Sequence, residues 1–153
     1  MIVTFCGHGK ETYNDKIRKH LYDTIETLIN QGANEFLLGG YGAFDLLAAH
    51  IVKDLKTKYP NIKSINVIPY IDREFDSDLY DCSEYPPIEN VPKRFAILKR
   101  NEWMVNRSDI VVAYVVHSWG GAAKTLEYAK RKRKNIIQIN SVFQKTIDKH
   151  KNL

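Results

Sequence analysis

Short apolar runs alternate with amphipathic segments along this chain of 153 residues. The runs are continuously apolar, which is typical of strands buried on both faces of a parallel sheet. Between them, apolar residues recur at three- and four-residue spacing, the pattern of helices that bury one face. The predicted strands are residues 2–6, 35–38, 64–69, 110–116 and 136–139. The predicted helices lie between Thr12 and Gly32, Phe44 and Leu55, Phe95 and Asn106, and Ala122 and Arg133.

This alternation of strands and helices predicts an α/β fold. We expect a single Rossmann-like, doubly wound parallel sheet of about five strands with helices on both faces. The predicted domain covers residues 1–140, and residues 141–153 are polar and basic, as in a C-terminal tail or short helix. Residues 70–92 form a long acidic stretch without periodicity. A loop of that length in a compact domain either covers a site or is partly disordered.

The composition is that of an ordinary globular protein, with 44% hydrophobic and 27% charged residues. No apolar run approaches the roughly 20 residues of a membrane span, and no signal peptide is visible. We therefore expect a cytoplasmic protein without a membrane partner. The two cysteines, Cys6 and Cys82, lack metal-ligand spacing, so we expect free thiols and no metal site.

The formal net charge is +5, and much of it lies in the run from Lys130 to Lys134. Such a run can contact nucleic acid. It can also be a solvated helix end, where cations offset the negative pole of the helix dipole. Aromatic residues do not interleave with this run, which favours the second interpretation and disfavours a nucleic-acid partner.

Three predicted strands lead into glycine-rich turns, namely Gly7-His8-Gly9, Gly39-Gly40-Tyr41-Gly42 and Gly120-Gly121. In open parallel sheets, ligands bind beyond the carboxyl ends of the strands. Glycine allows close approach of a ligand, and the free N–H groups of the following helix suit phosphate. The turns lack both the full G-x-G-x-x-G pattern and a Walker lysine, which disfavours ordinary NAD binding and P-loop chemistry. The turns together predict a site for a phosphate-bearing, nucleotide-like ligand, with no cofactor implied.

Four sequence blocks resemble, in order, the signatures of the YpsA-like branch of the SLOG superfamily. Residues 5–9 (FCGHG) are similar to its "FTGH" start, and residues 39–45 (GGYGAFD) to its "GG-x-x-G-x-D" turn. Residues 100–109 (RNEWMVNRSD) resemble "RN-x-x-MV-x-x-SD", and residues 120–129 (GGAAKTLEYA) resemble "GGT-x-x-T-x-x-YA". The blocks span nearly the whole chain.

The superfamily includes the LOG phosphoribohydrolases that activate cytokinins, the DNA-uptake protein DprA, and sensor domains for nucleotide-derived signals in bacterial defence. The resemblance implies a Rossmann-like fold that binds a nucleotide or a relative of one. It also implies pairing of copies through a helix face, hence a homo-oligomer. It does not imply one particular reaction.

LOG enzymes carry a functional arginine and a functional glutamate, and only the arginine has a clear match here. Arg100 lies at the arginine position and on the helix face expected to pack, where a charge favours an anionic partner. The LOG glutamate comes three residues after the threonine, whereas Glu127 comes two after Thr125. One residue turns a helix by about 100°. We therefore expect Glu127 to be solvated rather than catalytic, with Glu102 as a second candidate acid.

Several other residues near the turns carry suitable chemistry. Asp45 opens the second helix, where it can cap free N–H groups or bind a ribose hydroxyl. Trp119 can stack on a base, and Lys124 can pair with phosphate. The predicted ligand-binding set is Gly7, His8, Gly9, Gly39, Gly40, Tyr41, Gly42, Asp45, Arg100, Asn101, Trp119, Gly120, Gly121, Lys124 and Thr125.

Two functions follow from these residues. The favoured one is a binding protein, a sensor or sequestering protein for a nucleotide-derived molecule such as an ADP-ribose-like or cyclic signalling nucleotide. The alternative is a LOG-like phosphoribohydrolase that cleaves the N-glycosidic bond of nucleoside 5′-monophosphates, with Glu127 and Arg100 as its catalytic residues. The sequence leaves open whether the ligand is cleaved or only bound.

Overall fold

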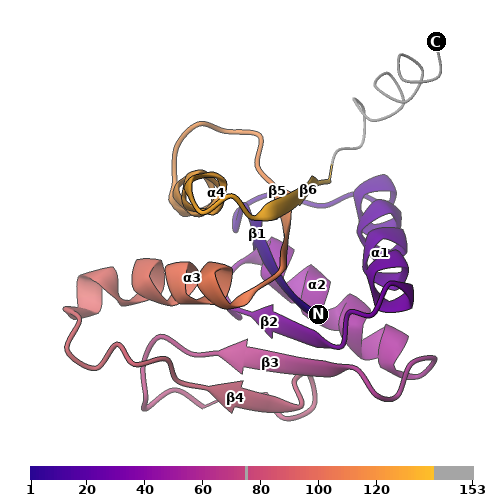
Figure 1. Cartoon of the computed structure of the whole chain (residues 1–153), viewed down its shortest axis with the longest axis horizontal. Coiled ribbons are helices and arrows are strands. Elements are labelled where there is room, and N and C mark those ends of the chain that lie inside the picture. The colour runs from indigo at the N-terminus through magenta and orange to yellow at the C-terminus, as the bar shows by residue number, and fades with distance from the viewer. Residues whose placement is uncertain (75, 140–153) are drawn as a thin grey trace.

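The computed structural model describes residues 1–74 and 76–139 and folds them into alternating strands and helices (Figure 1). The predicted tail at residues 141–153 lies outside the described residues. The elements, in chain order, are β1 (Ile2–Gly7), α1 (Asp15–Asn30), β2 (Glu35–Leu38), α2 (Ala43–Lys56), β3 (Lys63–Val67), β4 (Cys82–Glu84), a 3₁₀ turn (Lys93–Phe95), α3 (Ala96–Arg107), β5 (Ile110–Tyr114), α4 (Gly121–Arg131) and β6 (Asn135–Gln138).

All neighbouring strands in the six-stranded sheet are parallel, and their order is β4-β3-β2-β1-β5-β6. From β1, the chain first extends the sheet on one side and then returns to add β5 and β6 on the other. Strand order therefore reverses between β1 and β5, where a doubly wound sheet opens a crevice at its carboxyl edge. The predicted Rossmann-like α/β fold is confirmed, with one strand more than the five expected.

The additional strand is β4, in the stretch expected to be an irregular loop. Cys82 pairs with Ile65 of β3, so this cysteine lies on an edge strand rather than in a loop. The strand has only three residues and no buried position, so no apolar run announces it in the sequence. Cys6 lies buried in β1, and both cysteines are free.

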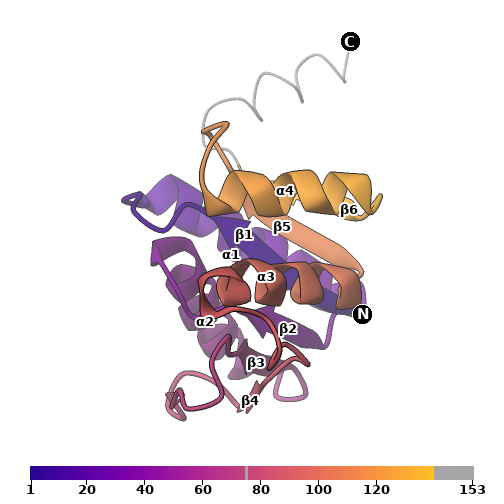
Figure 2. The ribbon, with the colours of Figure 1, turned by 90° about the vertical axis from the view of Figure 1, so that its left-hand side faces the viewer.

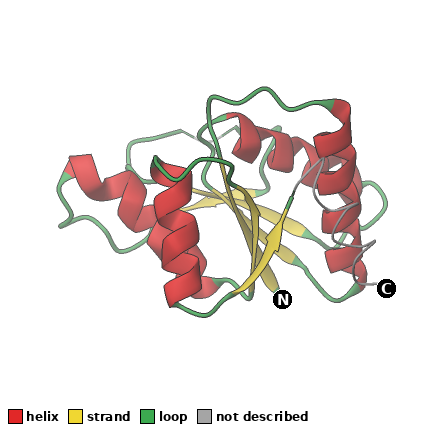
Figure 3. Ribbon diagram, turned by 90° about the horizontal axis from the view of Figure 1, so that it is seen from above, coloured by secondary structure: helices red, strands yellow, loops and turns green. Residues whose placement is uncertain are grey.

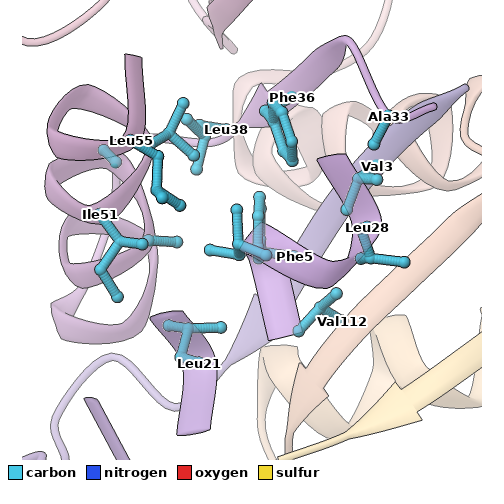
Figure 4. Close-up of a cluster of buried hydrophobic side chains, with 14 of the residues drawn as sticks. Val3, Phe5, Leu21, Leu28, Ala33, Phe36, Leu38, Ile51, Leu55 and Val112 are labelled. Atoms are coloured by element: carbon cyan, nitrogen blue, oxygen red, sulfur yellow. The ribbon is translucent and has the colours of Figure 1, made fainter. Parts of the chain in front are cut away.

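Helices cover both faces of the sheet (Figure 3). On one face, α1 and α2 pack on side chains of β1, β2 and β5, as the close-up of the core shows (Figure 4). On the other face lie α3 and α4, which run side by side across the sheet (Figure 2). Phe36 and Leu38 of β2 face one layer while Leu37 faces the other, as the period of two in a strand requires. No helix among residues 1–74 and 76–139 is long and apolar enough to cross a membrane.

Two of the helices begin in a way that matters for binding. The start of α1 is capped by Asn14, whose Oδ1 accepts a hydrogen bond of 2.9 Å from the backbone N–H of Ile17. In contrast, α2 and α4 begin at Gly42 and Gly120, which have no side chain to offer. Both glycines have positive φ, +86° and +91°, a conformation that favours glycine. The first N–H groups of α2 and α4 therefore have no side-chain cap and point toward the carboxyl edge of the sheet.

Candidate functional site

The first two glycine turns touch each other at the carboxyl edge. A Cβ atom on Gly42 would lie 2.6 Å from the Cα of Gly9. The backbone N–H of Ala43, the first residue of α2, donates to the carbonyl of Gly9 over 3.0 Å. Any larger side chain at Gly42 would therefore separate the β1 and β2 turns. These glycines allow two segments of backbone to meet where a ligand would approach.

His8 joins the first turn to the third. Its Nε2 accepts hydrogen bonds from the backbone N–H groups of Val116, at 2.8 Å, and His117, at 3.2 Å. A nitrogen that accepts two N–H groups carries no proton, so the neutral ring holds its proton on Nδ1. Burial, and then the neighbouring His117, lower the pKa of His8, against the opposing effect of Glu11. His8 thus fixes the turns of β1 and β5 together at the reversal of strand order.

Trp119 extends from this junction into solvent. Its ring stacks on His117, with centroids 4.5 Å apart and an interplanar angle of 22°. The Nε2 of His117 lies 2.9 Å from Oε1 of Glu11, which holds the stack from the other side. Trp119 is 68% exposed, and no atom lies within 4 Å of a Cβ built on Gly120 or Gly121. The start of α4 is therefore open and bordered by an exposed aromatic ring.

Arg100 is buried beneath the second turn, with only 1% of its surface exposed. Its Nη1 donates to the carbonyls of Gly39, at 2.7 Å, and Val67, at 2.8 Å. Its Nε donates to Oδ1 of Asn101 over 2.9 Å. The guanidinium group of Arg100, on the face of α3 that packs against the sheet, therefore bridges the carboxyl ends of β2 and β3. A ligand contact of Arg100 or Asn101 stays a prediction.

Asp45 lies near Arg100, and both side chains border the space that a Cβ atom on Gly39 would occupy. A Cβ at Gly39 would lie 2.8 Å from Oδ2 of Asp45 and 3.1 Å from Cζ of Arg100. Burial raises the pKa of Asp45 to about 7, against the opposing effects of Arg100 and the Gly39 backbone amide. The N-cap residue of α2 is Gly42, and no side chain caps this helix. Asp45 therefore does not cap α2, which was one of its two predicted roles. The site thus contains a half-buried carboxyl that titrates near neutrality.

The sequence did not identify Arg73 as a site residue. Its Cζ lies 4.2 Å from the ring centroid of Tyr41, and the Cζ of Arg100 lies 5.3 Å from the same centroid. The Nη1 of Arg73 also contacts the hydroxyl of Tyr41. Tyr41 therefore neighbours two guanidinium groups, one exposed and one buried. The sequence feature that could have pointed to Arg73 is the length of the 70–92 stretch. The first part of this stretch reaches over the turn that follows β2.

Asn66 and Tyr80 were also missed. Asn66 is 7% exposed and Tyr80 5% exposed, and both lie beside Gly40. A Cβ on Gly40 would be 2.9 Å from Oδ1 of Asn66 and 3.5 Å from the hydroxyl of Tyr80. The signal for Asn66 was a polar residue inside the apolar run SINVIP, because a buried polar residue is more informative than a buried apolar one.

Three predicted residues lie away from this cluster. Lys124, Glu127 and Glu102 line a groove between α3 and α4, together with Leu98, Ser118, Ala123 and Arg131. The side chain of Glu127 is 66% exposed and its Oε1 lies 3.5 Å from Nζ of Lys130. Thr125 is buried, and its hydroxyl donates to the carbonyl of Gly121 within its own helix. In the structure, Asp45 therefore lies beside the glycine turns and Arg100. Glu127 lies away from them, in the groove between α3 and α4.

Comparison with protein families supports the resemblance seen in the sequence. The model described as the YspA SLOG family matches residues 8–85, about half of the chain. Among curated proteins, the chain is 26% identical over 142 residues to the UPF0398 protein BH1768 of Halalkalibacterium halodurans, covering 83% of this chain and 72% of the relative. It is 28% identical over 141 residues to YoqJ, an uncharacterized SPbeta prophage-derived protein of Bacillus subtilis, covering 76% of this chain and 81% of the relative.

Solved structures share the fold at low sequence identity. DNA processing protein A of Helicobacter pylori, described for its single-stranded DNA binding mode, aligns with a TM-score of 0.64 at 19% identity, covering 90% of this chain and 64% of that one. A molybdenum cofactor binding protein of Rippkaea orientalis aligns with a TM-score of 0.61 at 20% identity, covering 99% of this chain and 84% of that one. At these identities the similarity shows the fold alone.

Proposed function

Because the chain belongs to the YspA SLOG family, we propose that it binds a nucleotide or nucleotide-derived small molecule at the carboxyl edge of its sheet, as a sensor or sequestering protein. The observation that carries the proposal is the start of α4. This helix begins at a glycine without a side-chain cap, with open space at Gly120 and Gly121. Unpaired N–H groups at a helix start form an anion site, and the helix dipole favours negative charge there.

The surroundings fit the rest of a nucleotide. Trp119 offers an exposed aromatic face directly before the glycines, as stacking on a base requires. Neighbouring strands are about 4.8 Å apart, so the ends of β5 and β2 are separated by roughly 10 Å. A nucleotide spans that distance. The phosphate would lie at the start of α4 beside a base stacked on Trp119, and the rest of a longer nucleotide-derived ligand would extend toward the Gly39–Gly42 turn.

A charge placed at the start of α4 tests this proposal. Gly121→Asp introduces a carboxylate where phosphate would bind, and Gly121→Asn introduces a side chain of the same shape without charge. Both side chains enter open space, so neither should disturb folding. We expect nucleotides that raise the melting temperature of the wild type to bind Gly121→Asp at least about tenfold more weakly, with a much smaller loss in Gly121→Asn. Equal affinity for wild type and Gly121→Asp would contradict the proposal.

Hydrolysis of an N-glycosidic bond is a second candidate, favoured by one observation. Such cleavage needs a carboxyl group that can exchange a proton near the sugar, and Asp45 has a pKa of about 7 beside the buried Arg100. This alternative therefore rests on Asp45 in place of Glu127. Chromatography of nucleoside monophosphates incubated with the protein would detect a released base. If bases are released, Asp45→Asn should abolish the reaction and Glu127→Gln should leave it unchanged.

We favour a small molecule over nucleic acid as the ligand. The basic run begins in the last turn of α4 and therefore lies at the end of that helix opposite Gly121 (Figure 2). Cations in the last turn offset the negative pole of the helix dipole without a partner. A single-stranded oligonucleotide whose affinity falls steeply with salt would support nucleic-acid binding instead.

A further inference from the structure

The loop between β5 and α4 carries the two features on which the proposed site depends. Trp119 and Gly120 end this loop, and Val116, Ser118 and Trp119 are exposed, so little buried surface holds it in place. Among the described residues, the only hydrogen-bond partner of the backbone from Val116 to Trp119 is the ring of His8, at 2.8 and 3.2 Å. The position of the loop therefore depends on one imidazole nitrogen of the first glycine turn.

This nitrogen can hold the loop only while it carries no proton. Nε2 of His8 accepts hydrogen bonds from the backbone N–H groups of Val116 and His117. A protonated Nε2 is a donor and would direct its own N–H group at both of them. One proton therefore removes both hydrogen bonds together. Histidine gains or loses that proton close to neutral pH, unlike the other common side chains.

We infer that His8 is a positioning residue that couples nucleotide binding to pH: its neutral ring holds the β5–α4 loop in the binding arrangement, and protonation of the ring weakens binding. The inference rests on the proposed function and names a regulation of the same site. The contacts run from His8 to the backbone of His117, whose ring stacks on Trp119 with centroids 4.5 Å apart. Because the ligand favours the neutral ring, its binding in turn makes His8 harder to protonate.

The groups that face His8 act on its charge in opposite directions. The centroid of the His117 ring lies 4.6 Å from that of His8, so a charge on one ring opposes a charge on the other. Glu11, whose Oε1 lies 2.9 Å from Nε2 of His117, favours protonation of His8. Tyr114 of β5 meets the His8 ring edge-on and the hydroxyl of Tyr13 donates to the His8 carbonyl, but phenols do not titrate near neutral pH. Burial and His117 outweigh Glu11 and lower the pKa of His8, so affinity should fall below about pH 6.5.

Two substitutions of His8 separate the effect of the proton from that of the hydrogen bonds. His8→Gln offers an amide oxygen near the position of Nε2 and does not titrate, whereas His8→Phe offers no acceptor. His50→Gln is the matched control, because it makes the same change at an exposed position of α2. Adenosine 5′-monophosphate, ADP and ADP-ribose are compared by thermal shift. The one that most raises the melting temperature of the wild type is titrated by calorimetry at pH 7.5 and pH 5.0.

The wild type should lose affinity relative to His8→Gln by at least about fivefold between pH 7.5 and pH 5.0. His8→Phe should bind more weakly than His8→Gln at both pH values, and His50→Gln should follow the wild type. Asp45 of α2 and the ligand phosphates also titrate in this range, but alike in every protein, so they cancel in these ratios. If His8→Phe does not fold, the ratio between wild type and His8→Gln decides alone.

Nuclear magnetic resonance follows the same step without a ligand. In the wild type, the amide proton signal of Val116 should shift as the ring nitrogens of His8 take up their proton. An amide signal that stays constant through that titration overturns the inference, whether or not a nucleotide binds. An affinity ratio between wild type and His8→Gln that is equal at both pH values also overturns it, while the proposed function stands. If none of the nucleotides binds the wild type at pH 7.5, the proposed function and the inference both fail.

Discussion

Replacing Asp45 with asparagine should stabilise the protein above neutral pH, and less so under mildly acidic conditions. The carboxyl of Asp45 is half-buried, and burial raises its pKa from 3.8 to about 7. Between these two values the folded protein keeps a proton that the unfolded chain has released. Stability therefore falls as the pH rises from about 4 to about 7, because the charged form must be held in a poorly solvated position. Asparagine has nearly the same shape and does not titrate.

The expected size of the effect follows from the same shift. One pH unit across which a single proton is bound only in the folded state changes stability by about 1.4 kcal/mol. Between about pH 5.5 and pH 7, the wild type should therefore lose about 2 kcal/mol through Asp45. Above pH 7 the loss stops, because both states are then ionised. The stability of Asp45→Asn relative to wild type should thus rise by about 2 kcal/mol between pH 5.5 and pH 8.5.

Urea unfolding at these two pH values measures the difference directly. Asp54→Asn is the matched control, because it makes the same chemical change at an exposed position of the same helix. Other titrating groups are common to all three proteins and cancel in the comparison. A stability difference between Asp45→Asn and wild type that is the same at both pH values would refute the argument that burial governs this carboxyl.

Three further substitutions test the framework of the site. Arg100→Met removes two hydrogen bonds to buried carbonyls and should lower the free energy of unfolding by about 3–5 kcal/mol in denaturant melts; a loss below about 1 kcal/mol would contradict the role given to it. Gly7→Ala places a Cβ 2.3 Å from the Phe44 ring and should lower the free energy of unfolding by at least about 1–3 kcal/mol. Gly121→Ala meets no atom within 4 Å and should lower it far less. Equal losses of stability in the two variants would be inconsistent with this packing. The pKa of His8 is lowered in the folded protein, so as the pH falls below about 6.5 the His8 side chain binds a proton in the unfolded chain before it does in the folded one. Acid should therefore destabilise the wild type. Unfolding experiments across this pH range should show a smaller loss of stability in His8→Phe.

The layers of the fold were predictable because burial of strands and helices leaves a periodic record in the sequence. Ile2–Gly7 and Ile110–Tyr114 are nearly continuous apolar runs, and they form the two adjacent strands β1 and β5. The α1 helix buries Ile17, Leu21, Ile25 and Leu28, which follow each other at three- and four-residue spacing. The β4 strand was not predictable, because an edge strand of three half-exposed or exposed residues needs no apolar pattern.

The site was predictable where it depends on backbone conformation and much less where it depends on side-chain direction. Gly42 and Gly120 start helices at positive φ, as the glycine turns suggested. The position of Arg100 on the packing face of α3 was also correctly inferred, yet its partners are the carbonyls of β2 and β3. Which strand ends lie beside which depends on the strand order, and local sequence does not encode it. Asn66 and Tyr80 therefore meet at Gly40 without any shared motif.

This division indicates where ligand selectivity resides. Backbone N–H groups at helix starts recognise phosphate in the same way whatever is attached to it, so the glycine turns cannot distinguish one nucleotide from another. Discrimination requires side chains that leave a hydrogen bond unmade when the wrong group is bound. At the proposed site, the side chains with suitable chemistry are Asp45 beside the second turn and the exposed Trp119 before α4. The proposed function therefore predicts that substitutions at Asp45 and Trp119 change which ligand is preferred, while the glycines stay the same.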